Sequence, residues 1–248
     1  MENQLGFPVA PSSFNGSSRK VEIGACFEWL RQGWVLFAAE AGIWVGAAAI
    51  LIGILVVLHF VPILGTVAAN LILPVLVAGM LHMCRKQNAG EPLAIGDLFI
   101  GFQQKASGLV IIGALYMVAI LAIGLVIGAV VSGGIAGGVV AGNVAGLGMA
   151  IGAVMLATVL GMVLMIPVVM AVLFAPALVF FNDMPPTDAL KASFSACTTN
   201  WIAFILYCIV LLVLGSIALI PLALGFLVLI PVASGALYAA YRDVFPGT

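Results

Sequence analysis

The sequence predicts an all-α membrane protein with six transmembrane helices, arranged as hairpins and accompanied by interfacial amphipathic elbow helices. Two observations predict this class. Of the 248 residues, 65% are hydrophobic and only 7% are charged, whereas a water-soluble domain carries about 25% charged residues. In addition, the connections between the long apolar stretches alternate in charge. Every Asp, Glu, Lys and Arg lies in a chain end or in or beside every second connection, and the other connections carry no such charge. Lipid is therefore the predicted solvent for most of the chain.

The chain divides into a tail and one domain. Residues 1–23 are expected to form a disordered cytoplasmic tail, because this segment is polar and contains Pro8, Pro11 and a cluster of Ser, Asn and Gly. No apolar core followed by a small-residue cleavage site occurs in it, so a cleaved signal peptide is not expected. Residues 24–245 are expected to form a single six-span transmembrane domain.

Six stretches are long and apolar enough to cross the hydrocarbon core of a membrane, which takes about 20 residues in a helix. Helices are expected because an open strand would leave backbone groups unpaired in lipid. Short connections at Pro62 and Pro221 predict antiparallel hairpins at the beginning and at the end of the domain. The predicted spans are 38–60, 64–84, 108–131, 149–174, 200–219 and 222–241.

The distribution of charge predicts the orientation of these spans. All eight Lys and Arg residues lie in the amino tail, the connections 85–107 and 175–199, or the carboxyl tail. The connections 61–63 and 132–148 contain none. Since short connections that carry positive charge stay in the cytoplasm, both termini are expected to be cytoplasmic.

Three segments that precede hairpins are expected to be elbow helices lying in the membrane interface. Glu28 and Arg31 stand three residues apart, as do Asp188 and Lys191, which places each pair one helical turn apart. A looser copy spans 97–102. Aromatic side chains accompany the charges in all three segments, a pattern typical of helices at the lipid–water boundary.

A run of glycines occupies 132–148, with Gly134, Gly138, Gly142 and Gly146 four residues apart. This spacing lets two helix backbones approach closely, which predicts a packing seam if the neighbouring spans extend through the run. Two alternatives remain open: a flexible neutral loop, because each glycine weakens a helix by about 1 kcal/mol, or a re-entrant segment lining a cavity.

No catalytic signature occurs: HExxH, GxSxG, GxxxxGK[ST] and an intact GxGxxG are all missing. The chain is therefore expected to be neither an enzyme nor a cofactor- or metal-binding protein, and its net charge of −1 predicts no nucleic-acid partner. Glu40 lies either inside the first span, where an ionisable group is often functional, or at headgroup level beside a base such as Arg31 or Lys191. The other candidate functional residues are polar and tryptophan residues at the elbows and in the glycine run. The full set is Glu40, Asp97, Asp188, Trp34, Trp201 and Asn143.

Several short segments of the chain resemble segments of a known protein family. They are 62–65, 97–102, 174–179, 189–194, 200–201 and 238–243. They resemble an uncharacterised family of proteobacterial multi-pass inner-membrane proteins, which is similar to the membrane domain attached to some glycerophosphodiester phosphodiesterases. The resemblance covers about 24–245 and implies a six-helix protein of the bacterial inner membrane. No catalytic residue is carried over, because this chain has no phosphodiester-cleaving domain.

Two functional hypotheses follow. The first is a non-catalytic scaffold, accessory or lipid-sensing protein, whose partners are membrane lipids and an unidentified membrane protein or a second copy of the chain. The alternative is a transporter or permeation pathway for an apolar or amphipathic solute, which the prolines within the spans favour because they kink helices.

Overall fold

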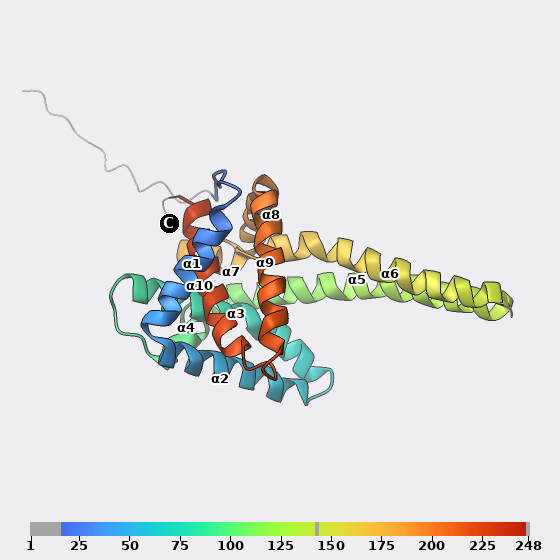
Figure 1. Ribbon diagram of the computed structural model, residues 1–248, viewed down its shortest axis with the longest axis horizontal. Coiled ribbons are helices and arrows are strands. Elements are labelled where there is room, and N and C mark those ends of the chain that lie inside the picture. Colours follow the sequence, from blue (N-terminus) through green and yellow to red (C-terminus); the bar gives the residue numbers. More distant parts are fainter. Residues whose placement is uncertain (1–15, 142–143, 247–248) are drawn as a thin grey trace, which may run out of the picture.

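The computed structural model describes residues 16–141 and 144–246, and these residues form helices and connections without strands (Figure 1). The elements, in chain order, are α1 (Ala25–Ala39), α2 (Ala41–His59), α3 (Leu64–Asn88), the 3-10 helix η1 (Ile95–Phe99), α4 (Ile100–Gln104), α5 (Ala106–Ala141), α6 (Val144–Val172), α7 (Ala175–Asn182), α8 (Pro186–Thr199), α9 (Trp201–Leu219) and α10 (Phe226–Val244).

The predicted fold class is confirmed. Among the described residues, six helices are long and apolar enough to cross a membrane: α2, α3, α5, α6, α9 and α10. They pair in sequence as the hairpins α2–α3, α5–α6 and α9–α10, and helices α1, α4 and α8 stand before them where the elbows were expected.

Several boundaries differ from the predicted ones. The first span begins at Ala41 rather than at 38, because Glu40 has a non-helical backbone (φ −140°, ψ 49°) that separates α1 from α2. The second span continues to Asn88 and so includes Arg85 and Lys86, which the sequence assigns to the connection 85–107. The connection between α9 and α10 is longer than the predicted two residues and contains Leu222 and Ala223 in the left-handed region (φ 53° and 66°).

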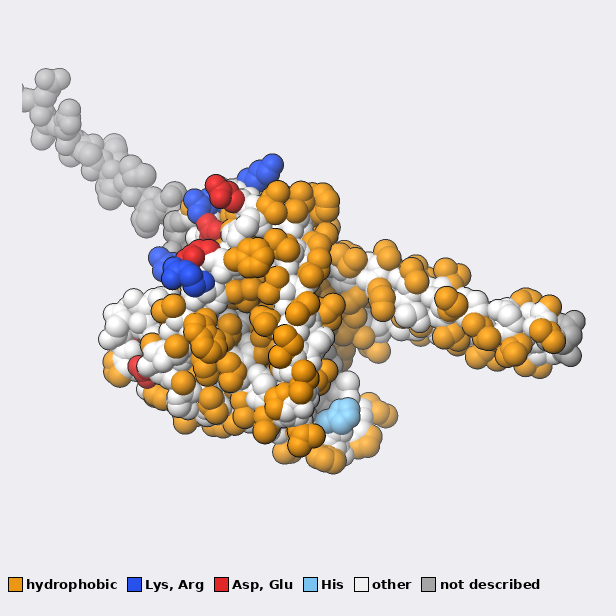
Figure 2. All heavy atoms as spheres, in the orientation of Figure 1, with side chains coloured by type: hydrophobic (Ala, Val, Ile, Leu, Met, Phe, Trp, Pro, Cys, Tyr) orange, Lys and Arg blue, Asp and Glu red, His pale blue; other side chains and the backbone are white. Residues whose placement is uncertain are grey.

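Charged side chains gather at one end of the molecule. Figure 2 shows most of the visible acidic and basic groups close together near the ends of α1 and α10, whereas the hairpins extend away from this end with apolar surfaces. We call this the charged end. Charged residues from the two ends of the chain thus lie together in the fold, as the Arg19–Asp243 ion pair also shows.

The glycine run is helical where the structure describes it. Helix α5 continues to Ala141 and α6 begins at Val144, so that the two form one long arm (Figure 1). A Cβ added to Gly134 would lie 2.0 Å from the Cβ of Ala153, and one added to Gly138 would lie 2.5 Å from the carbonyl oxygen of Gly146. Of the three alternatives, the packing seam within the chain is the one observed.

The arm is longer than a membrane is thick. Helix α5 has 36 residues, which at about 1.5 Å per residue gives about 54 Å, whereas the hydrocarbon core measures about 30 Å. Since the outer surface of the arm is apolar along its length, hydrocarbon can cover all of it only if the arm is strongly tilted.

Helix α1 packs antiparallel along α10, and glycines let the two backbones touch. An added Cβ at Gly33 would lie 2.2 Å from the carbonyl oxygen of Val232, and one at Gly235 would lie 2.7 Å from the Cα of Gly33. Close to this crossing, the buried ring of Trp29 contacts Phe204 of α9 at a centroid distance of 5.5 Å. The charged end is thus built on a helix pair that is fixed by close packing.

Candidate functional site

A cavity of about 600 Å³ lies between α1 and α10 at the charged end. We call it the α1–α10 cavity. Its walls combine charged, amide, aromatic and aliphatic side chains, and Asn88 at the end of α3 completes them. The lining residues are Glu28, Trp29, Arg31, Gln32, Val35, Leu36, Asn88, Gly235, Tyr238, Ala239, Arg242 and Asp243.

The spacing of the lining residues explains how two helices form this cavity. On α10, Gly235, Ala239 and Arg242 lie three and four residues apart, so they share one face of the helix. On α1, Arg31 and Val35 lie four residues apart and share the facing side. Because the helices are antiparallel, the charged residues of both lie toward one end of the cavity and the small and aliphatic residues toward the Gly33–Gly235 crossing. The cavity is therefore amphiphilic, with polarity that changes along its length.

The first polar group of the cavity rim is centred on Glu28. Its carboxylate accepts two hydrogen bonds of 2.7 Å from the Arg31 guanidinium and one of 2.9 Å from the Gln32 amide. The Arg31 and Gln32 hydrogen bonds lower the pKa of Glu28 to about 2, and the hydrogen bond and the negative charge of Glu28 raise the pKa of Arg31. Both side chains are thus charged at neutral pH and engaged with each other.

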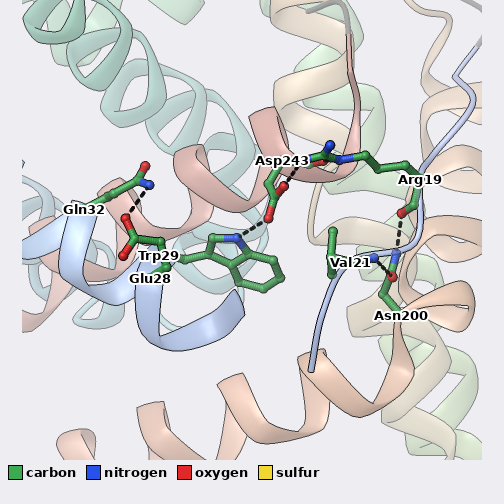
Figure 3. Close-up of polar contacts among 7 residues, drawn as sticks. All are labelled: Arg19, Val21, Glu28, Trp29, Gln32, Asn200 and Asp243. Carbon is green, nitrogen blue, oxygen red and sulfur yellow. Dashed lines mark hydrogen bonds and ion pairs between the residues drawn. The ribbon is translucent and has the colours of Figure 1, made fainter. Parts of the chain in front are cut away.

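The second polar group is centred on Asp243, near the end of α10. Its carboxylate accepts a hydrogen bond of 2.9 Å from the indole N–H of Trp29 and forms an ion pair with Arg19 (Figure 3). The neighbouring Arg242 is exposed, and within residues 16–141 and 144–246 no carboxylate lies within ion-pair distance of its guanidinium. Arg242 is therefore available at the cavity rim.

A short segment of the chain before α1 is fastened beside this group by Asn200. The Asn200 side chain is 5% exposed. Its carbonyl oxygen accepts a hydrogen bond of 2.8 Å from the backbone N–H of Val21, and its amide nitrogen donates to the backbone carbonyl of Arg19 at 3.0 Å (Figure 3). Since Arg19 also donates its backbone N–H to the carbonyl of Val244 at 2.8 Å, we call residues 16–23 the amino strap. It joins the start of α9 to the end of α10.

Glu40, a candidate from the sequence, lies at the kink between α1 and α2 rather than inside a span. The two bases considered as its partners pair elsewhere: Arg31 with Glu28 at 2.7 Å and Lys191 with Asp188 at 3.4 Å. The structure thus places Glu40 between the two helices, without either of the two bases named as its partners.

Asp97 stabilises the connection between α3 and α4. Its carboxylate accepts hydrogen bonds of 2.8 Å from Lys86 and 2.9 Å from the backbone N–H of Ala94. Burial raises the pKa of Asp97, but the Lys86 and Ala94 hydrogen bonds together with nearby positive charge outweigh that effect and leave the pKa below its usual value. These contacts assign Asp97 to the structure of the connection.

The other candidates are dispersed. Asp188 lies in the first turn of α8 and is exposed. Trp34 is 54% exposed and lines an apolar hollow against α9 and α10, whereas Trp201 is 56% exposed beside Lys20. Asn143 lies outside the described residues. The structure does not bring the five described candidates together, and the α1–α10 cavity is lined by other residues.

Sequence reasoning missed Asn200, Asp243 and Trp29 as partners. The residues that contact each other here are far apart in the chain: Val21 and Asn200 are separated by 179 positions, and Trp29 and Asp243 by 214. The available signal was the position of Asn200 at the start of the predicted span 200–219, because an amide at the end of a helix often bonds to backbone.

Comparisons of the chain with protein-family models, curated proteins and solved structures gave no match. The fold and the cavity by themselves define a multi-pass α-helical membrane protein with an amphiphilic cavity at its charged end. The resemblance to the proteobacterial inner-membrane family stays a prediction.

Proposed function

We propose that this chain is a non-catalytic accessory protein of the bacterial inner membrane that binds and senses membrane lipid through the α1–α10 cavity. The observation that carries this proposal is the change of polarity along the cavity, from Arg242 and Glu28 toward the charged end to Val35 and Ala239 toward the Gly33–Gly235 crossing. Phospholipids have the same distribution of polarity, so one molecule can satisfy both parts of the lining.

The surroundings of the cavity support a role in binding rather than in a large conformational cycle. The two helices that form it touch through Gly33 and Gly235, and the Trp29–Asp243 hydrogen bond joins them again at the charged end. A cavity between two such contacts is pre-formed, which reduces the conformational entropy lost when a ligand binds.

The orientation of the protein is part of the proposal. With every Lys and Arg in the tails or in alternate connections, the rule that cytoplasmic connections carry positive charge places the charged end and both termini in the cytoplasm. The α1–α10 cavity then opens at the level of the inner-leaflet headgroups.

Narrowing the cavity should reduce the lipid that the protein retains. Val35 lines the cavity and is 54% exposed, so Val35→Trp adds an indole there without entering the core. We expect the purified protein, in a mild detergent, to lose about half or more of its co-purifying phospholipid, because the bulky ring occupies space needed by the ligand. Lipid extraction and mass spectrometry measure the amount per mole of protein.

Val56→Trp is the matched control, because Val56 is 49% exposed on α2 and lies outside the cavity lining. It should retain as much phospholipid as the unmodified chain. Equal retention by all three proteins would contradict lipid binding in the cavity.

A permeation pathway is the second candidate function, and two hollows favour it. One, of about 250 Å³, reaches Pro74 and is lined by α3, α5, α6, α7 and α10; the other, of about 260 Å³, reaches Pro167. Both are predominantly apolar, which suits a hydrophobic solute. Release of a hydrophobic dye from proteoliposomes no faster than from protein-free liposomes would count against this candidate.

A further inference from the structure

We propose that the α1–α10 cavity selects the phosphate group of a phospholipid and that Arg242 is its principal anchor. This inference rests on the proposed lipid-binding function and adds to it the chemistry of the headgroup and the residue that recognises it. It requires no step beyond reversible binding.

The balance of charge at the rim favours an anion. Two carboxylates line the cavity, those of Glu28 and Asp243, and each already has a guanidinium partner, Arg31 and Arg19 respectively. Arg242 adds a third guanidinium. Arg19 pairs with Asp243 from outside the lining, so both lining carboxylates are engaged in ion pairs, and Arg242 is left as the lining guanidinium that lacks an ion-pair partner in the described part of the chain.

The groups around Arg242 are suited to phosphate oxygens. A guanidinium presents N–H groups in a planar fork that binds two phosphate oxygens at once. Tyr238 lies four residues before Arg242 on the same face of α10, and the amides of Gln32 and Asn88 complete the polar lining. Hydroxyl and amide groups donate hydrogen bonds, and a Gln or Asn amide has two N–H groups, of which Gln32 uses one for its bond to Glu28.

The apolar part of the cavity favours a lipid over free phosphate. Beyond the polar rim, the lining consists of Val35, Leu36, Gly235 and Ala239. These residues offer no side-chain hydrogen bond, whereas they can contact the first carbons of an acyl chain. A ligand that carries both a phosphate and an acyl chain therefore fits the whole cavity better than inorganic phosphate does.

The test is a binding titration of the full chain in detergent by native mass spectrometry, with dioctanoyl phosphatidylglycerol as the probe. We expect Arg242→Gln to raise Kd about tenfold or more, because a hydrogen-bonded charged contact is lost. Arg242→Lys should give a smaller loss, since it keeps the charge without the fork. Lys191→Gln is the matched control: it removes a base from an exposed ion pair outside the cavity, and Kd should stay unchanged.

Two further ligands distinguish the sources of phosphate. Dioctanoylglycerol, which lacks the phosphate, should bind the unmodified chain more weakly than the phospholipid does. Its Kd should be the same for the unmodified chain and for the Arg242→Gln variant. Inorganic phosphate should compete poorly. Competition by inorganic phosphate at the concentrations at which the phospholipid binds would overturn the assignment of a lipid.

The outcomes separate this inference from the proposed function. If Arg242→Gln leaves the phosphatidylglycerol Kd unchanged, or if Lys191→Gln weakens binding equally, Arg242 is not the anchor and the inference fails. Lipid binding in the cavity is tested separately, by the amount of lipid that the Val35→Trp and Val56→Trp variants retain.

Discussion

Replacing Gly33 with alanine is expected to lower the stability of the protein markedly. The new Cβ would lie 2.2 Å from the carbonyl oxygen of Val232 and 2.8 Å from the backbone nitrogen of Ala236. Both are backbone atoms of α10, so no side-chain rotation relieves the clash and the two helices must move apart. Overpacking of this kind costs about 1–3 kcal/mol or more. The midpoint of thermal unfolding in detergent, followed by fluorescence-detected size exclusion, measures the loss.

Gly53→Ala provides the matched control for this substitution. Gly53 lies within α2, and a Cβ added there meets nothing within 4 Å. Alanine is favoured over glycine in a helix by about 1 kcal/mol, so this variant should be as stable as the unmodified chain or more so. A Gly33→Ala midpoint equal to that of Gly53→Ala would show that α1 and α10 do not cross at this glycine. That result would also contradict the close contact of α1 and α10 on which the shape of the α1–α10 cavity depends.

Replacing Asn200 with leucine is expected to release the amino strap. Leucine has a similar size but cannot accept from the Val21 N–H or donate to the carbonyl of Arg19, bonds of 2.8 and 3.0 Å in the structure. Leaving buried polar groups without partners costs about 1–3 kcal/mol. Hydrogen exchange at the Val21 amide should therefore accelerate about ten- to a hundredfold, because exchange reports the free energy of local opening.

Thr199→Val controls for a change at the same junction. The Thr199 hydroxyl is exposed and donates to the backbone carbonyl of Ser195 within α8, so the strap should be unaffected. If Val21 exchanges at the same rate in Asn200→Leu as in Thr199→Val, Asn200 does not hold the strap.

The sequence predicted the number of spans because hydrophobic length is a local property. A stretch such as 201–219 contains every residue needed to satisfy its own backbone as a helix, and the structure places α9 at these residues. Boundaries were less accurate where tertiary contacts decide them. Helix α3 continues to Asn88, beyond its apolar part. In this last turn the Gln87 side chain accepts a hydrogen bond from the indole N–H of Trp44 and donates one to the backbone carbonyl of Leu36.

The glycine run shows why composition left alternatives open. Gly134 and Gly138 face α6 and form the seam, but Gly124 and Gly152, which share the same four-residue spacing with other glycines, have no atom within 4 Å of an added Cβ. The spacing alone does not say which glycines face a neighbouring helix, because that depends on how the two helices pack.

The candidate site was the least predictable part of the molecule. Glu40 is a candidate because charge is unusual beside an apolar stretch, and Asp97 because it begins an expected elbow. The structure places them at a kink and in a connection. The cavity instead depends on α1 and α10, whose contacts join opposite ends of the chain, for example Trp29 with Asp243. No local pattern contains that information.

The placement of all charge on one side of the membrane is tested most directly by labelling single cysteines with a membrane-impermeant maleimide, in full-length protein with the native cysteines replaced. Phe60 and Ile220 are each 80% exposed at the tips of the α2–α3 and α9–α10 hairpins, and Lys191 is exposed on α8, in a connection that is expected to be cytoplasmic. Phe60→Cys and Ile220→Cys should be labelled in intact bacterial cells, and Lys191→Cys only after lysis. Labelling of Lys191→Cys in intact cells, or of the hairpin tips only after lysis, would contradict the account.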